Sequence, residues 1–459
     1  MAVAPAGGQE HRSRFALAAG LITLFGLALR LLYVLTARVD QPIYGDGLQY
    51  MVYAWNLLNH GVFSCSPAGS SIVVPDSYRG PGYPLFLAAA LGLGGGDVDA
   101  GVRYARLGQV FLGAAGVPLT IALARQWIGN HWALLAGVLV ACWPHLVTFC
   151  GTLMSETLLG FFILLGLWFL CVGERRGSKT HMAAGGVAFG CAYLVNAIVL
   201  FFPVLVSFAL VRRGRATLAA VLMAAAVAAP AIWGWRNLHV VSAETEFNHA
   251  IDAFVWGSSP VYMPAFNSRW VDPDAKRIVE FQKEEANRVR ADPVGGFARI
   301  VERMGQDPLA YLSWYLLEKP FALWDWPIVI GNGDIYYPPT HDSAFERIAA
   351  LRGIKIALQW LNPLLFGLAL WSALRFLGRL LAGQREPSLT PVALAIFMLY
   401  VTAMHAILQA EPRYSIPYRP VEIILALGTL AALAGVARRR SSRWPGHPAR
   451  VSAEPRRLP

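Results

Sequence analysis

Two short polar strings interrupt a strongly apolar chain, and each contains a residue that can take part in chemistry. Residues 44–50 contain Asp46, and residues 78–84 contain Arg79. A carboxylate can accept the proton of a reacting hydroxyl or amine, and a guanidinium can bind two phosphate oxygens at once. Because both strings follow the first apolar stretch, they place an acid and a base beside a bilayer, which indicates chemistry on a lipid-linked substrate.

The elements that must position these residues are membrane helices. Apolar residues make up 56% of the chain and charged residues only 15%. Apolar stretches about as long as the roughly 20 residues that cross a hydrocarbon core recur along it. They lack the period-two alternation of barrel strands, and a backbone in lipid must form its hydrogen bonds within its own segment. The sequence therefore predicts an all-α polytopic membrane protein.

Short loops rich in arginine and lysine set the expected topology, because cytoplasmic loops carry the excess of these residues. The basic loops 174–179, 212–215 and 375–385 and the tail are therefore placed inside. This gives about ten spans, with both termini on the cytoplasmic side of the cell (inner) membrane. The spans are expected near residues 15–36, 103–126, 132–151, 155–173, 181–196, 197–211, 216–236, 355–378, 390–409 and 416–437. The short pair over 181–211, hinged at Asn196, could instead be a broken or re-entrant element.

The same topology divides the chain into parts. They are a membrane core over 1–236 with a first outer loop over 37–102, an outer insertion over 237–354, C-terminal spans over 355–437 and a basic cytoplasmic tail over 438–459. Residues 84–96 are too few to cross and predict an interfacial helix in the outer loop. The insertion holds 16 Asp and Glu against 11 Lys and Arg, in a chain of formal net charge +11. The basic excess therefore lies inside, where anionic membrane lipid attracts it, and no nucleic-acid partner is expected.

The insertion contains three Asp-Pro pairs, and each is typical of a helix start. Asp272-Pro273, Asp292-Pro293 and Asp307-Pro308 all place a capping acid before the residue favoured at the first helical position. Apolar residues after the first pair recur with helical spacing, and aromatic residues after the third suit a helix at the level of the lipid headgroups. We expect a helical insertion, whose helices could also serve only to cap the bundle.

The other candidate residues fall on the outer side as well. Glu156 begins the fourth expected span, and Glu411, Arg413 and Tyr414 lie between the ninth and tenth. A carboxylate at full membrane depth costs roughly 2.5–3.5 kcal/mol on insertion scales, but the cost shrinks near a helix end, and the helix amino terminus favours an anion. Glu156 is therefore open to two interpretations, helix capping or chemistry.

Two histidines lie in apolar spans, where a hydrogen-bonded core histidine is the default. His145 and His405 could form a metal site together with Asp46 and Glu156, but no ligand spacing supports it. We expect that no cofactor is required, with a divalent metal possible but not favoured.

Taken in order, these strings resemble the GT-C superfamily of polyprenyl-phosphate-sugar glycosyltransferases. The nearest likeness is to the bacterial relatives of protein O-mannosyltransferases and of the aminoarabinose transferase that modifies lipid A. The matching pieces are Arg30, Gly45-Asp46 with Tyr50 and Ala54, residues 79–84, 154–157 and 235–237, and residues 411–414 with Pro417. Two positions depart from the pattern. Gly47 stands where many relatives carry a second acid, which leaves fewer candidates for a metal site, and Gly80-Pro81 stands where Pro-Pro is common.

The resemblance implies a GT-C-like bundle that acts as an inverting glycosyltransferase. The sugar, a hexose or pentose, would pass from a polyprenyl-phosphate donor to an envelope glycan, lipid or protein at the outer membrane face. A phosphate leaving group is already a stable anion and needs charge stabilisation more than protonation. Asp46 is expected as general base, with Glu156 as a second catalytic candidate. Arg79, Arg413, Tyr414 and Lys319 are expected at the donor phosphate, and Gln49, Tyr50 and Tyr83 at the rest of the substrate.

Other interpretations stay open. Asp46 could be an ordinary turn residue, Arg79 could fix its loop through backbone carbonyls, and Arg413 could pair with Glu411. A flippase or transporter for a lipid-linked sugar is the alternative from another functional class. An oligosaccharide ligase or polymerase, which would use the same kind of helical scaffold, is a third. Transporters tend to show internal repeats and polar residues near the membrane midplane. This sequence shows no repeat, and its polar residues gather at one face.

Overall fold

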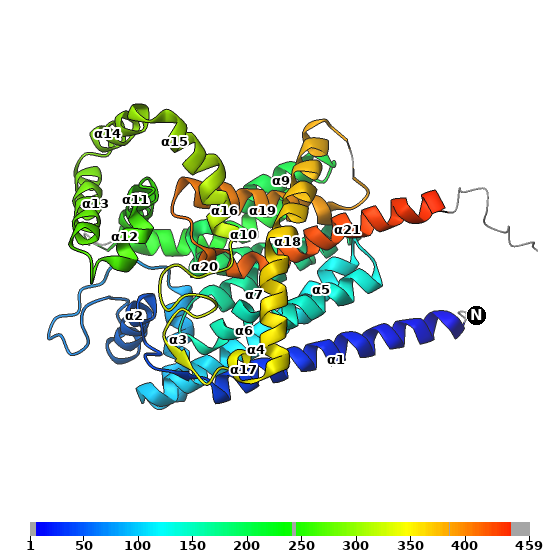
Figure 1. Ribbon diagram of the computed structural model, residues 1–459, viewed down its shortest axis with the longest axis horizontal. Coiled ribbons are helices and arrows are strands. Elements are labelled where there is room, and N and C mark those ends of the chain that lie inside the picture. The colour runs from blue at the N-terminus through cyan, green and yellow to red at the C-terminus, as the bar shows by residue number, and fades with distance from the viewer. Residues whose placement is uncertain (1–5, 241–244, 385, 442–459) are drawn as a thin grey trace, which may run out of the picture.

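The chain folds almost entirely into α-helices, as its composition predicts (Figure 1). The structure is a computed structural model that describes residues 6–240, 245–384 and 386–441. The first half contains α1 (Ala6–Thr36), α2 (Asp46–His60), α3 (Gly82–Leu93), α4 (Val98–Arg125), α5 (Asn130–Cys142), α6 (Pro144–Thr148), α7 (Glu156–Arg176), α8 (Lys179–Val195), α9 (Phe202–Arg212) and α10 (Ala216–Leu238). Single 3₁₀ turns, η1 (Phe149–Gly151) and η2 (Ala197–Val199), follow α6 and precede α9.

The second half begins with the insertion. Its helices are α11 (Glu246–Gly257), α12 (Tyr262–Ser268), α13 (Pro273–Ala291), α14 (Pro293–Gln306), α15 (Pro308–Ser313), the π-helical η3 (Trp314–Glu318), α16 (Lys319–Trp324) and α17 (Ala344–Arg347). The chain ends in α18 (Ala349–Leu381), α19 (Leu389–Ile407), α20 (Pro412–Ser415), the 3₁₀ turn η4 (Ile416–Tyr418) and α21 (Arg419–Ser441). In the part of the chain that the structure describes, β1 (Arg38–Val39) and β2 (Thr340–His341) form the one sheet, an antiparallel pair that joins the first loop to the insertion.

Seven helices among the described residues are long and apolar enough to cross a membrane, and the bent pair α5–α6 makes an eighth if it is one span. Each expected span is helical and the fold class is confirmed, but the test of length and composition counts fewer spans than the expected number of about ten. The segment expected as two spans over 181–211 accounts for the difference. There α8 has 17 residues and α9 has 11. Between them Asn196 adopts an extended backbone, and its side chain caps the next turn by accepting a hydrogen bond from the Ile198 amide at 3.0 Å.

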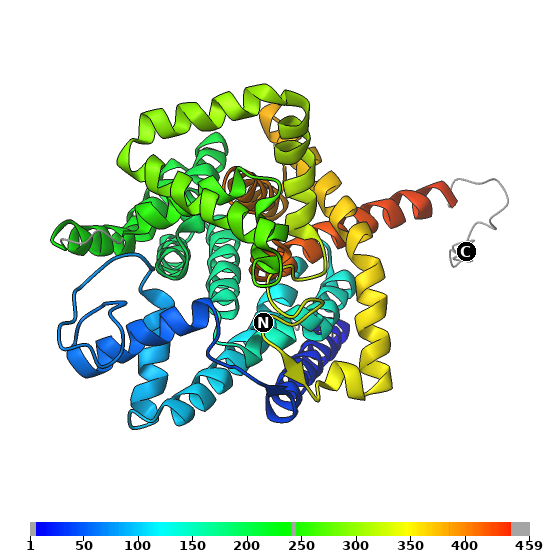
Figure 2. The same ribbon diagram turned by 60° about the vertical axis from the view of Figure 1, so that its left-hand side comes forward.

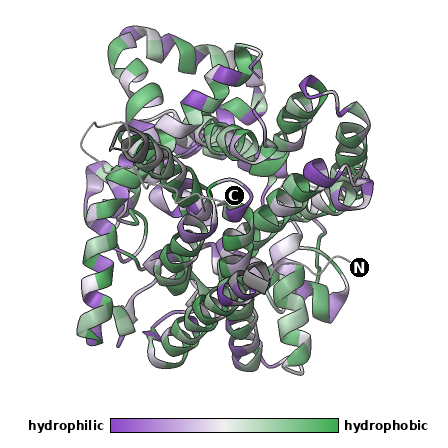
Figure 3. Ribbon diagram, turned by 90° about the vertical axis from the view of Figure 1, so that its right-hand side faces the viewer, coloured by the Kyte–Doolittle hydropathy of each residue, from purple (hydrophilic) through white to green (hydrophobic). Residues whose placement is uncertain are grey.

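The first loop and the insertion share one end of the bundle. In Figure 1 the start of α1 and the end of α21 point to the right, whereas α2, α11 and α13 lie on the left. The long helices of the bundle are coloured mostly green, for hydrophobic residues, in Figure 3. The expected topology requires this arrangement, because it places both ends of the chain away from the two polar strings.

A buried arginine shapes the bundle beneath the first loop. Arg30 of α1 is fully buried, and its guanidinium donates to the carbonyl oxygens of Val140 and Ala141, each at 3.2 Å. These carbonyls end α5, where four backbone acceptors lose their partners within the helix. The chain then bends by 57° into α6, which begins at Pro144. Arg30 is therefore explained as a cap for a broken helix inside the membrane.

The Asp-Pro pairs of the insertion do start helices, as expected. The side chains of Asp272, Asp292 and Asp307 accept hydrogen bonds from backbone amides in the first turns of α13, α14 and α15 at 2.9, 3.0 and 3.2 Å. The three helices follow one another as an arch around α11 and α12 (Figures 1 and 2). The local sequence thus fixes the corners of the arch.

The orientation in the membrane is a testable prediction. A cysteine at the exposed position of Lys283 in α13 should react with a membrane-impermeant maleimide in intact cells, because the insertion is expected outside. A cysteine at the exposed position of Arg215 should react only after permeabilisation. Both variants are made with Cys65 and Cys191 replaced by Ser, so that the partly exposed native thiols do not contribute. The reverse pattern of labelling would contradict an outer location of the site.

Candidate active site

The centre of the candidate site is a carboxylate held between two arginines from distant parts of the chain. Asp46 at the start of α2 contacts Arg79 through Oδ1 at 2.8 Å and Arg413 through Oδ2 at 2.9 Å. The Asp46 side chain is 28% exposed, whereas those of Arg79 and Arg413 are 12% and 8% exposed. The sequence placed these three residues on one side of the membrane, and the structure brings them into direct contact. The carboxylate is the part of the cluster that solvent or a ligand can reach.

Two glycines allow α2 to begin at this point. Gly45 precedes the helix with φ +55°, in the left-handed region that favours glycine, and a Cβ there would lie 2.5 Å from the Tyr337 hydroxyl. A Cβ on Gly47 would lie 2.8 Å from the Leu153 carbonyl oxygen. The close approach of α2 to that backbone therefore explains why glycine rather than a second acid follows Asp46.

Arg79 is held by several side chains around it. Gln49, one turn along α2, accepts hydrogen bonds from Nε at 2.9 Å and from Nη2 at 2.5 Å, and Nη1 lies 3.3 Å from His249 Nε2 in α11. The guanidinium also lies 5.3 Å from the ring centre of Tyr50 and 5.6 Å from that of Tyr78. Gln49 and Tyr50 are thus at the expected site. Their contacts orient the arginine.

Arg413 is surrounded by two further acids. Its Nε lies 3.5 Å from Glu156 Oε1 and 3.8 Å from Glu411 Oε2, too far for good hydrogen bonds. Among the described residues, neither this Nε nor the Oε2 atoms of the two glutamates has a hydrogen-bond partner. Tyr414 and Tyr337 cover the guanidinium, with ring centres at 5.1 and 4.8 Å. The cluster therefore contains buried polar atoms that can form hydrogen bonds with a ligand.

The charges of the cluster determine the protonation of Asp46. Burial alone would raise the pKa of its carboxyl group, but the positive charges of Arg79 and Arg413 outweigh burial and hold that pKa below its ordinary value. Burial, together with the neighbouring Arg79 charge, lowers the pKa of His249 to about 3. Asp46 is thus an anion and His249 a neutral ring at any physiological pH.

A loop of the insertion lies over the site, and no motif in the sequence predicts it. The Glu411 carboxylate accepts a hydrogen bond from the Ile330 backbone amide at 3.0 Å, and Tyr337 from the same loop contacts both Tyr44 and Arg413. Glu411 therefore contacts Arg413, as one interpretation of the sequence held, and also anchors the loop. Neither Tyr337 nor His249 belongs to a local motif, so only the fold could identify them.

Two expected site residues lie outside the cluster. Lys319 is fully buried, and its ammonium donates to the carbonyl oxygens of Gly257 at 2.9 Å and Leu408 at 2.6 Å. Tyr83 is also fully buried, and its hydroxyl donates to Gln109 Oε1 at 2.6 Å. Lys319 thus joins α11 to the end of α19, and Tyr83 packs beneath the site against the ring of Tyr50.

The two histidines of the spans are part of the core. His145 lies 3.0 Å from the Trp326 carbonyl oxygen, and His405 lies 3.0 Å from that of Gln409. Neither histidine contacts Asp46 in the part of the chain that the structure describes. Within the described residues, no group of three or more His, Cys, Asp and Glu side chains is placed to hold a metal ion.

Comparison with known proteins gives one family match. Residues 97–235, from the cap of α4 to α10, match the family described as dolichyl-phosphate-mannose-protein mannosyltransferase. This match confirms the resemblance to the GT-C superfamily of membrane glycosyltransferases. The search of curated proteins gives no match.

The comparison with solved structures gives matches that extend over most of this chain. The archaeal oligosaccharyltransferase AglB from Archaeoglobus fulgidus, in complex with an inhibitory peptide and a dolichol-phosphate, is 14% identical with a TM-score of 0.47, over 95% of this chain and 53% of that chain. ArnT from Cupriavidus metallidurans, bound to undecaprenyl phosphate, is 15% identical with a TM-score of 0.43, over 95% of this chain and 61% of that chain. The chain thus spans between about half and three fifths of the length of these proteins.

The buried Lys319 predicts a pH dependence of stability. Burial lowers its pKa from 10.5 to about 7, so between these values the unfolded chain binds more protons than the folded one, and the free energy of unfolding rises with pH. The rise is at most about 1.4 kcal/mol per pH unit. Melting in detergent should show the wild type gaining stability between pH 7 and 9, and Lys319→Met lacking that gain. The exposed substitution Lys283→Met should behave as the wild type, and an equal gain in Lys319→Met would contradict the assignment.

Proposed function

We propose that this protein transfers a sugar from a polyprenyl-phosphate donor to an acceptor at the outer face of the cell membrane, with inversion at the anomeric carbon. The observation that carries the proposal is the Asp46 carboxylate, partly exposed and held between Arg79 and Arg413. This cluster places a proton acceptor, the Asp46 carboxylate, beside two groups that can bind phosphate. The family match supports the same class of reaction.

Arg413 is proposed as the main contact of the donor phosphate. Its guanidinium is always charged, and a phosphate offers the planar donor group two acceptor oxygens at once. Its Nε makes no hydrogen bond in the described structure, so one donor is available without breaking an existing contact. Tyr414, which covers the same guanidinium, is proposed to assist. Lys319 is proposed to act indirectly, by holding α16 in position, because its ammonium is bound to two backbone carbonyl oxygens.

Asp46 is proposed as the general base. The acceptor oxygen or nitrogen bonds to the anomeric carbon as the bond from that carbon to the phosphate oxygen breaks. The acceptor proton passes to the Asp46 carboxylate, and polyprenyl phosphate leaves as an anion held by Arg79 and Arg413. When the phosphate takes over part of the arginine contacts, Asp46 loses some of the charge that lowers its pKa and becomes a better base.

Glu156 is proposed as a second acid that keeps Arg413 in place. It begins α7, where the amino end of the helix favours a carboxylate, and its Oε1 lies 3.5 Å from Arg413 Nε. Oε2 has no partner among the described residues and could receive a hydroxyl of the donor sugar. This combines the two interpretations that the sequence left open for Glu156.

The base role predicts a large kinetic effect of Asp46→Asn. Positioned acid–base catalysis contributes about a hundredfold to ten-thousandfold, so turnover should fall within that range. The measurement is release of free polyprenyl phosphate from a panel of polyprenyl-phosphate monosaccharides by the protein in lipid discs, with envelope extract as acceptor. The matched control is Asp40→Asn, which removes an exposed acid of the same loop that pairs with His341.

Near-full turnover by a folded Asp46→Asn would remove Asp46 from the base role. No release by the wild type with any donor would favour the flippase, or an enzyme that moves whole oligosaccharides.

A second prediction concerns metal ions. Two guanidinium groups at Asp46 can stabilise the leaving phosphate, so we propose that no metal ion is required. Treatment with EDTA, followed by its removal, should leave lipid-phosphate release within about twofold of the untreated rate. A loss of activity that Mg²⁺ or Mn²⁺ restores would show that a metal takes part.

A further inference from the structure

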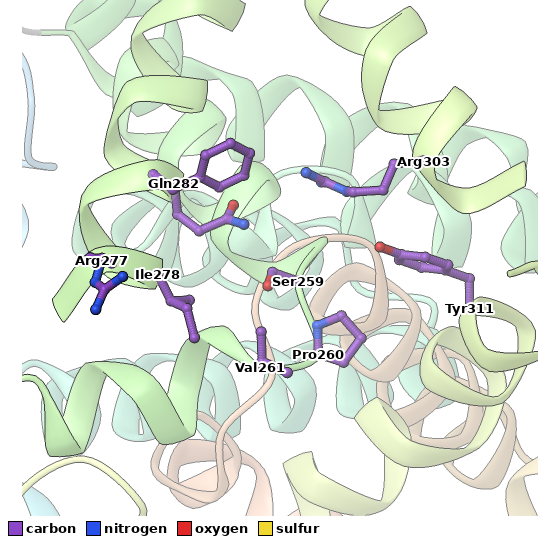
Figure 4. Close-up of a pocket in the computed structure, with 9 residues that line it drawn as sticks. Ser259, Pro260, Val261, Arg277, Ile278, Gln282, Arg303 and Tyr311 are labelled. Carbon is purple, nitrogen blue, oxygen red and sulfur yellow. The ribbon is translucent and has the colours of Figure 1, made fainter. Parts of the chain in front are cut away.

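An open pocket lies in the insertion, away from the Asp46 cluster. It has a volume of about 500 Å³ and is enclosed by the turn between α11 and α12 and by residues of α13, α14 and α15 (Figure 4). This volume is typical of sites that bind small ligands. Its wall is mostly apolar and includes Val261, Ile278 and Phe281, and a few polar side chains point into it. The expected topology places the pocket outside the membrane.

Gln282 is the first residue that indicates a ligand-binding site. Only 4% of its surface is exposed, yet its Oε1 has no hydrogen-bond partner among the described residues. Figure 4 shows its amide directed into the pocket, toward Arg303 and Ser259. A buried amide oxygen without a partner costs free energy unless a ligand or water satisfies it. Folding alone does not explain this residue, because a leucine of similar size would pack there without that cost.

Arg303 is the second sign. Its Nη2 donates to the Ser258 hydroxyl at 2.9 Å, and its Nε is buried without a hydrogen-bond partner in the described structure. No acid among the described residues forms an ion pair with it. In contrast, Arg277 at the rim of the pocket is exposed and pairs with Asp274 at 2.7 Å. The inner arginine is thus a positive charge that lacks a counterion, which favours an anionic ligand.

The other side chains of the pocket indicate which kind of molecule carries the negative charge. The Ser259 and Tyr311 hydroxyls and the Gln282 amide offer several hydrogen bonds to a ligand with hydroxyl groups (Figure 4). Phe281, which also lines the pocket, offers a flat apolar face. A sugar ring has an apolar C–H face and a rim of hydroxyls, and a uronic acid adds a carboxylate. An acidic saccharide therefore uses the whole lining, whereas a free anion would use only the arginine.

The pocket is connected to the candidate active site by one helix. His249 near the start of α11 contacts Arg79, and Ser259, just beyond the end of α11, lines the pocket. The helix rises by about 12 Å over the eight residues from His249 to its end, a distance that an oligosaccharide of a few units can span. We propose that the acceptor is an acidic saccharide and that this pocket binds it. The pocket holds the far end of the acceptor while the near end reacts at Asp46. This inference rests on the proposed function.

Direct binding tests the proposal without any donor lipid. The protein in lipid discs is titrated calorimetrically with tetragalacturonate, and separately with maltotetraose as a neutral tetrasaccharide of equal length. We expect the acidic probe to bind at least tenfold more tightly than the neutral one. Arg303→Gln should weaken binding of the acidic probe at least tenfold, because hydrogen bonds to charged groups contribute most. Arg288→Gln, which removes an exposed charge of α13 that does not line the pocket, should stay within about twofold of the wild type.

Gln282→Leu separates a binding role from a packing role. We expect an unchanged or higher melting temperature, because a buried amide oxygen without a partner is removed. We also expect about threefold to tenfold weaker binding of tetragalacturonate. The proposal is overturned if the acidic probe does not bind, if it binds no better than the neutral probe, or if Arg303→Gln binds it like the wild type.

A failure of this inference is distinguishable from a failure of the proposed function. Asp46→Asn should still bind tetragalacturonate more tightly than maltotetraose, because Asp46 does not line the pocket. Probe binding without any release of polyprenyl phosphate would support the saccharide pocket and contradict the proposed transferase. Release of polyprenyl phosphate without probe binding would support the transferase and contradict the saccharide pocket.

Discussion

The contact on which the rest of the site depends is the double ion pair of Asp46 with Arg79 and Arg413. Two guanidinium groups that are nearly buried at the end of a membrane bundle need a counterion, because an unpaired charge there is very unfavourable. The single carboxylate serves both, and so joins the first loop to the segment between α19 and α21. Everything else around it, including Gln49, Glu156 and the tyrosine rings, keeps the guanidiniums in place.

The backbone must come very close together for this contact to form. A side chain on Gly47 would meet the Leu153 carbonyl, and one on Gly82 would lie 2.8 Å from the backbone of Leu194 in α8. The first contact brings α2 against the turn that precedes α7, and the second brings α3 against α8. The two polar strings are thus pressed onto the bundle by glycines. That is why the string around Arg79 carries glycine on both sides of Pro81.

Much of this arrangement could be predicted from the sequence, because its causes are local or depend on composition. Apolar runs predicted the helices, Asp-Pro pairs predicted the starts of α13, α14 and α15, and the distribution of charge placed Asp46, Arg79 and Arg413 on one side. The contacts of His249 and Tyr337 could not be predicted, because they depend on how the insertion folds back over the first loop. Lys319 was expected at the phosphate, but its ammonium is bound to the Gly257 and Leu408 carbonyls. The hinge at Asn196 could also be predicted, but the lengths of the helices on either side of it could not, and α8 with 17 residues and α9 with 11 are too short to be counted as spans.

The same ion pairs that stabilise the site would also control the proposed reaction. With no donor bound, the charges of Arg79 and Arg413 hold the pKa of Asp46 low, so the carboxylate is a weak base. A donor phosphate competes for those guanidiniums, and each hydrogen bond that it takes from Asp46 raises the basicity of the carboxylate. The base would therefore be activated only when a leaving group is in place. Because the phosphate and the carboxylate share the two arginines, donor binding and proton abstraction are coupled by direct contact, and no movement of a whole helix is needed to link them.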